Sequence, residues 1–165
     1  MSRPGSEGHG VGLYSRDARG RRNVWLLIAG CLSTAAALLH LMVIAGGPDW
    51  YRFFGAGEAM AGLAARGSLK PALVTLVIAT VLFVWAAYAF SGAGLVRRLP
   101  LMRTALLLIT AIYLVRGLAL FPTLAFKPKL VDSFTVWSSL IVLVYGITYA
   151  IGTWRAWPAL GRRRR

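Results

Sequence analysis

Four long apolar stretches, separated by short polar or glycine-rich segments, dominate the pattern of the chain. They cover residues 24–45, 71–90, 101–121 and 134–154. At about 1.5 Å of rise per residue, a helix of this length crosses a hydrocarbon core of about 30 Å. Lipid offers the backbone no hydrogen-bond partners, so each stretch is expected to be helical. The pattern therefore predicts an all-α, polytopic membrane protein built as a bundle of four transmembrane helices.

Local signals mark several ends of these helices. Pro71 is tolerated in the first turn of the second span, where its missing N–H has no helical partner. Pro122 is expected to end the third span, and Asp132 or Ser133 is expected to cap the fourth. The run 24–45 is longer than the apolar core of a secretory signal and no clear cleavage site follows it, so we interpret it as the first transmembrane helix.

The segment 48–66 between the first two spans mixes aromatic, small and charged residues. Placed on a helix at 100° per residue, Phe53, Met60 and Ala64 fall on one arc, whereas Arg52 and Arg66 fall opposite. This is the pattern of an amphipathic helix lying along the membrane interface. The aromatic residues are expected to anchor it there. The anchors are Trp50, Tyr51, Phe53 and Phe54.

Composition supports the membrane class. Of the 165 residues, 58% are apolar and 15% are charged, and the net charge is +14. Basic residues concentrate in a flexible tail (1–23), in short loops and in a second tail (155–165), on either side of one membrane domain (24–154). Anionic lipid headgroups explain this placement better than nucleic acid does. The C-terminal arginines predicted to contact these headgroups are Arg162, Arg163, Arg164 and Arg165.

The same basic residues predict the orientation. The two tails and the loop between the second and third spans hold 13 of them, against 5 in the other two connections. The positive-inside rule then places both termini in the cytoplasm of a cell whose inner (plasma) membrane holds the protein. The segment 48–66 would face outward.

Two ionisable residues lie inside predicted spans. His40 and Arg116 each lie about five residues from the outer ends of their spans, at a depth of roughly 8 Å. An arginine at this depth normally faces the bundle interior or a partner. Glu58 is the acid that we expect to pair with it, because its small-residue helix could sink toward the bundle. The sequence thus predicts an outward-facing polar site.

The ligand-binding candidates of this site are His40, Glu58, Arg116, Tyr113, Arg52 and Asp49. A structural ion pair that reaches toward the interface is the alternative interpretation. The chain has no HExxH, GxSxG or P-loop motif, and it has one cysteine, Cys31. With two histidines, one of them in the tail, we expect no metal site, and we identify no cofactor.

The first span ends in LHLMVIAGGPDWYRFFGAGE and the third ends in IYLVRG. With four spans in about 130 residues, the chain resembles small bacterial four-helix membrane families, including the broad DoxX-like group. The resemblance covers the hydrophobic region but neither tail. It implies a quinone-linked or redox accessory role.

Three functions follow as hypotheses. The first is a non-enzymatic binding or accessory protein whose outward pocket holds a small ligand, a lipid headgroup or an ion. The second is a structural or assembly subunit that docks onto a membrane-protein partner or a second copy. The third is a membrane enzyme that uses Glu58 or His40 as acid or base.

Overall fold

The computed structural model describes residues 22–128 and 131–160, so the first 21 residues and Arg162 to Arg165 lie outside it. Four stretches of the described chain are helical, long enough and apolar enough to cross a membrane. The chain is therefore an all-helical, multi-pass membrane protein, as its pattern predicts. In chain order, the helices are α1 (Val24–Gly46), α2 (Pro48–Phe53), α3 (Glu58–Ala65), α4 (Lys70–Gly92), α5 (Met102–Leu118), α6 (Leu120–Phe126) and α7 (Ser133–Leu160).

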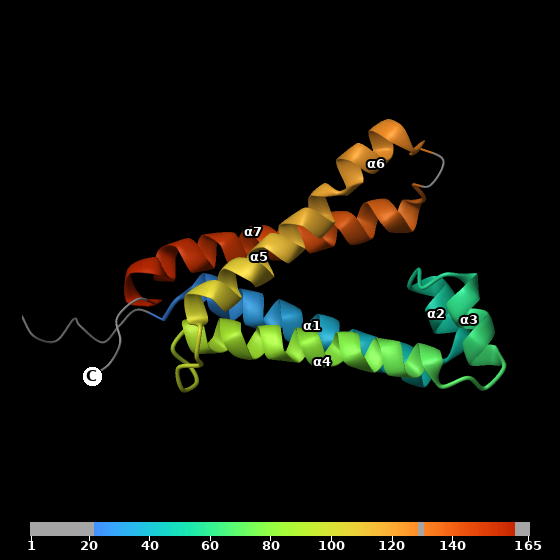
Figure 1. The fold of residues 1–165 in the computed structure, drawn as a ribbon, viewed down its shortest axis with the longest axis horizontal. Helices are drawn as coiled ribbons and strands as arrows, with labels where there is room; N and C mark the ends of the chain where they lie inside the picture. The colour runs from blue at the N-terminus through green and yellow to red at the C-terminus, as the bar shows by residue number, and fades with distance from the viewer. Residues whose placement is uncertain (1–21, 129–130, 161–165) are drawn as a thin grey trace, which may run out of the picture.

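The long helices form two antiparallel pairs, α1 with α4 and α5 with α7 (Figure 1). The pairs pack together at the end of the bundle where α1 begins and α7 ends, which we call the terminal end. Figure 1 shows them diverging toward the opposite end, which we call the hairpin end because α2 and α3 fold there as a short helical hairpin (48–65). The hairpin lies against α1 and α4.

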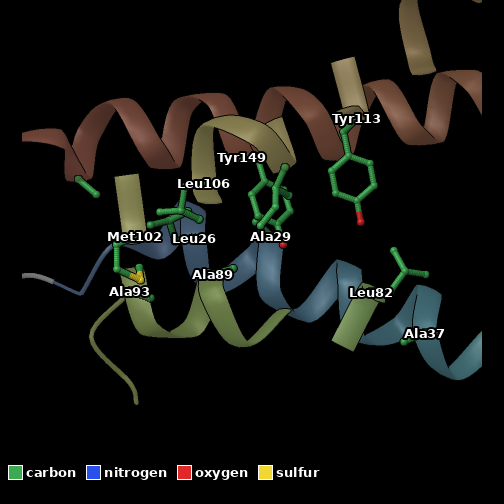
Figure 2. Close-up of a cluster of buried hydrophobic side chains, with 12 residues drawn as sticks. Leu26, Ala29, Ala37, Leu82, Ala89, Ala93, Met102, Leu106, Tyr113 and Tyr149 are labelled. Carbon is green, nitrogen blue, oxygen red and sulfur yellow. The ribbon is translucent and has the colours of Figure 1, made fainter. Parts of the chain in front are cut away.

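Small residues let the helices approach closely, as is usual in membranes, where packing replaces the hydrophobic effect between helices. A Cβ atom at Gly117 would lie 2.8 Å from the α7 backbone at Leu143. The main cluster of buried side chains fills the terminal half of the bundle, and Leu26, Leu106 and Tyr149 are fully buried in it (Figure 2). The two pairs are therefore joined chiefly through this half.

Polar caps fix the starts of α1 and α7. The side-chain oxygen of Asn23 accepts a hydrogen bond from the Leu26 N–H, and its amide donates to the Gly152 carbonyl at 2.7 Å. Asp132 Oδ1 accepts from the Thr135 N–H at 2.7 Å, which makes Asp132 the cap of α7 and confirms one of the two predicted candidates. These bonds hold the pKa of Asp132 below its usual value.

The prediction of one continuous helix over 48–66 is wrong. The segment folds as two shorter helices, because Gly55 and Gly57 adopt positive φ angles of 70° and 85°. Glycine reaches this region without the steric cost that a Cβ atom brings. The turn between α2 and α3 closes with an Ala56 N–H to Tyr51 carbonyl bond of 2.9 Å. The helices therefore fold back on each other.

Two span boundaries also differ from the prediction. Pro122 does not end the third span, because it lies in the first turn of α6, where its missing N–H is tolerated. The helix bends just before, at Ala119, because Pro122 cannot donate to the preceding turn. The helix of the fourth span, α7, continues to Leu160 rather than ending at residue 154. Arg103 donates to the Trp157 carbonyl at 3.2 Å and covers its ring, which stabilises this last turn.

Candidate functional site

The charged residues of the hairpin form an exposed clasp between α2 and α3. The Arg52 guanidinium donates to both carboxylate oxygens of Glu58, at 2.9 and 3.0 Å, and to Asp49 Oδ1 at 2.9 Å. A bidentate contact of this kind has a fixed geometry. It joins the two short helices across the glycine turn. We interpret the clasp as the device that closes the hairpin.

The clasp corrects the predicted partner of Glu58. Its side chain is 73% exposed, and hydrogen bonds from Arg52 together with the charge of that guanidinium lower the pKa of Glu58. The same contacts raise the pKa of Arg52 further above its usual value. Glu58 starts α3 directly after the Gly57 turn, which directs it toward Arg52 rather than into the bundle. The predicted Glu58–Arg116 pair is therefore absent from the described structure.

Arg116 lies in the last turn of α5 and binds a neutral partner. Its Nη1 donates to Ser139 Oγ on α7 at 3.1 Å. Among residues 22–128 and 131–160, no acid forms an ion pair with it. A guanidinium in a membrane span is normally paired or reaches water. Arg116 therefore carries a charge that the described protein does not neutralise.

His40 is half-buried on α1, and its Nδ1 lies 2.7 Å from the Ala36 carbonyl oxygen. A carbonyl can only accept, so this contact places a proton on Nδ1. In the neutral ring, Nε2 is then an acceptor. The described residues provide no partner for it. His40 and Arg116 lie on different helix pairs, and the described contacts do not join them.

Tyr113 belongs to a buried chain of hydroxyl groups at the junction of the two pairs. Ser33 Oγ lies 3.1 Å from the Tyr113 hydroxyl and 2.9 Å from the Tyr149 hydroxyl, which lies 3.1 Å from the Trp85 carbonyl. Figure 2 shows both tyrosines extending from α5 and α7 toward α1 and α4. The Tyr113 ring also meets the Trp85 ring edge-on, at 4.9 Å between centroids.

The direction of this chain follows from its last acceptor. The Trp85 carbonyl cannot donate, so the proton of Tyr149 points to it. Ser33 must then donate to Tyr149, and Tyr113 must donate to Ser33. Every hydroxyl proton of the chain has an acceptor, and Tyr113 is the one hydroxyl of the three that accepts no hydrogen bond within it. Tyr113 is therefore a structural donor in a satisfied network and offers a ligand no proton without breaking it.

Tyr51 was predicted to anchor the hairpin in the interface, but it faces the protein. It is 3% exposed and packs with Val43 of α1 and Ala61 of α3. By contrast, Phe53 is 76% exposed, and Trp50 also reaches the surface. Anchoring by Trp50, Phe53 and Phe54 stays a prediction. The reversal at Tyr51 follows from the glycine turn, which folds α3 over the side of α2 that carries it.

Sequence reasoning did not select three neutral residues as site candidates, namely Ser33, Ser139 and Tyr149. Their only signal was a hydroxyl within an apolar span. In the described chain, no group of three or more His, Cys, Asp or Glu side chains could hold a metal ion.

Comparisons with protein-family models, with curated proteins and with solved structures give no match for this chain. The resemblance to the DoxX-like group therefore stays a prediction.

Proposed function

We propose that this chain is a non-enzymatic membrane protein that binds the anionic group of an amphiphile, most simply a lipid headgroup, at Arg116. The observation that carries the proposal is the neutral partner of this guanidinium. Ser139 satisfies one N–H of Arg116 but leaves its charge uncompensated. A phosphate or carboxylate accepts two N–H bonds from arginine and neutralises it at the same time.

The depth of Arg116 supports a headgroup as the ligand. On α7, Trp137 is 67% exposed and Trp154 is 78% exposed. They are 17 residues apart, which is about 26 Å along a helix, close to the thickness of the hydrocarbon core. Tryptophan favours the two interfaces, so this pair marks them. Ser139 follows Trp137 by two residues, which would place the guanidinium about 3 Å from the interface, a shallower depth than the roughly 8 Å expected from the predicted span.

A second candidate function is that of an assembly subunit, and α6 favours it. This short helix bends away from α7 (Figure 1). It exposes Phe121 (57%), Leu124 (52%) and Phe126 (84%). Lipid chains or a partner helix could cover such a surface. Native mass spectrometry in mild detergent distinguishes the two, because a subunit would carry the mass of a partner or of a second copy.

For orientation, we propose that the terminal end faces the cytoplasm and the hairpin end faces outward in an inner (plasma) membrane. The support is the distribution of basic residues along the chain, 13 against 5. Reporter fusions after residue 165 and near Ser68 test this orientation. An externally active reporter at the C-terminus would reverse it.

The test of binding compares phosphatidic acid with phosphatidylcholine as additives to the purified protein in neutral detergent. We expect phosphatidic acid to raise the melting temperature of the wild-type protein, and Arg116→Gln to lose that increase. Arg66→Gln is the matched control, because Arg66 loses the same charge at an exposed position outside the spans.

If both variants lost the increase in melting temperature equally, the effect of phosphatidic acid would depend on the net charge of the protein rather than on a site, and the proposal would fail. Arg116→Lys adds a finer measurement. Lysine keeps the charge but cannot bind bidentately, so it should retain only part of the increase.

A further inference from the structure

The hydroxyl of Tyr51 is buried and has no hydrogen-bond partner among the described residues. It lies beneath the hairpin, in a cluster formed by Tyr51, Val43 and Ala61. A buried O–H group without a partner is costly, and such groups in native proteins are normally satisfied by protein, water or a ligand. The surrounding side chains of this cluster are apolar. The described chain therefore leaves this O–H group open to a partner from outside it, either water or a ligand.

His40 brings a second unsatisfied atom to the same side of α1. It precedes Val43 by three residues, which places the two side chains about 60° apart around the helix and about 4.5 Å apart along it. The face that Tyr51 covers at Val43 thus continues directly to His40. The Nδ1 atom of His40 is occupied by Ala36, so Nε2 is the free acceptor.

We propose that Tyr51 and His40 bind one hydroxyl group of a neutral, hydroxyl-bearing lipid beneath the hairpin. The Tyr51 O–H donates to the oxygen of this hydroxyl, and the hydroxyl donates to His40 Nε2. One alcohol group satisfies both atoms, whereas an ether or ester oxygen satisfies Tyr51 alone. The site requires no charge and does not depend on Arg116.

Depth points to a lipid as the source of this hydroxyl. His40 lies six residues before the end of α1, about 9 Å along the helix and so on the hydrocarbon side of the interface, where a lipid enters more readily than a water-soluble alcohol. A diacylglycerol carries one free hydroxyl and no charged headgroup that would hold this hydroxyl at the surface.

The hairpin must move for a lipid to reach Tyr51, because the hydroxyl is covered. Glycines flank the hairpin on both sides, Gly47 with a φ of 71° and Gly67 with a φ of 74°, and neither would have a neighbour within 4 Å of an added Cβ. Glycine permits wide backbone rotation. The hairpin can therefore turn about these two points while α2 and α3 stay joined by their clasp.

The experiment measures binding of dioleoylglycerol and of its methyl ether to the full-length protein in nanodiscs. We expect the methyl ether to bind about tenfold more weakly than the alcohol, because it cannot donate to His40. Tyr51→Phe should weaken binding of the alcohol by a similar factor. The matched control is Tyr88→Phe, which removes a phenol from the half-buried Tyr88 of α4 and should change nothing.

A stability measurement excludes misfolding as the explanation. Without lipid, Tyr51→Phe should melt at or above the wild-type temperature, since it removes an unsatisfied buried group. Arg116→Gln should bind the alcohol normally even if it loses phosphatidic acid, so the two proposals fail separately. Unchanged binding of the alcohol to Tyr51→Phe, or equal binding of alcohol and ether to the wild-type protein, would overturn the inference. An equal effect of free glycerol at the same concentration would reject a lipid as the source.

Discussion

The donor-to-acceptor direction of the buried hydroxyl chain predicts how much stability is lost when Ser33 or Tyr113 is replaced. The number of hydrogen bonds alone does not predict this difference. Ser33→Ala removes the acceptor of Tyr113 and leaves that phenol with a buried proton and no partner. Tyr113→Phe removes a donor, but Ser33 still donates to Tyr149. Ser33 is fully buried and Tyr113 is 6% exposed, so bulk water does not replace the lost contacts. The two substitutions break overlapping bonds and should differ in cost.

The magnitudes follow from the two contacts of Ser33, at 3.1 and 2.9 Å. Hydrogen bonds between membrane helices contribute about 0.6 kcal/mol each on average. Tyr113→Phe should therefore destabilise by about 0.6 kcal/mol. Ser33→Ala loses both bonds and strands a donor, which adds about 1 kcal/mol or more. We expect a total of about 2 to 3 kcal/mol.

The double variant provides the decisive comparison. Adding Tyr113→Phe to Ser33→Ala removes the stranded proton, so the double variant should be more stable than Ser33→Ala alone by about 1 kcal/mol. The free energy of unfolding is measured by denaturation with sodium dodecyl sulfate in mixed micelles, followed by tryptophan fluorescence. A double variant less stable than Ser33→Ala would refute the assigned direction. Equal costs of the two single variants would refute it as well.

Three other predictions test the packing and the charges. Gly117→Ala places a Cβ against the α7 backbone and should lower the free energy of unfolding by about 1–3 kcal/mol, whereas Gly62→Ala, with its nearest neighbour at 3.5 Å, should not. The pKa of Glu58 is lowered in the folded state, so its clasp with Arg52 contributes stability above about pH 4.3, and this stability is lost as the pH falls through the folded-state pKa. Hydrogen exchange of the hairpin amides should therefore become faster at acid pH in the wild-type protein. Glu58→Gln should abolish this dependence on pH. Arg103→Gln should speed hydrogen exchange in the last turn of α7 and leave the start of α7 unchanged; equal exchange at both ends would contradict the capping role.

The spans could be predicted from the sequence because hydrophobic length is a local property. Each apolar run is bounded by its own polar residues, and no tertiary contact alters that. The cap at Asp132 was equally local. The hairpin was harder to predict, because a helical wheel assumes a continuous helix. A glycine interrupts a helix only where it adopts a non-helical backbone conformation, and the sequence does not show whether it does. Here Gly55 and Gly57 both adopt positive φ angles.

The candidate site was less predictable because ion pairing is a competition among geometries. Glu58 begins α3 and Arg116 lies in the last turn of α5, far apart in the chain, whereas Arg52 is six residues from Glu58. Once the glycine turn forms, Glu58 pairs with the nearer guanidinium, that of Arg52. The neutral partner Ser139 could not be found at all from charge patterns. A serine in an apolar span is as consistent with simple packing as with a contact to an arginine.

Each helix pair of this bundle is also continuous in the chain. The α1–α4 pair is complete with residue 92, before α5 begins at Met102. During synthesis, the first pair and the hairpin between its helices therefore leave the ribosome before any residue of the second pair. The bonds that join Asn23 to Gly152 and Ser33 to Tyr149 close last, when α7 enters the membrane. Biosynthesis of this protein thus proceeds through two successive helix pairs, which then dock onto each other in one late step.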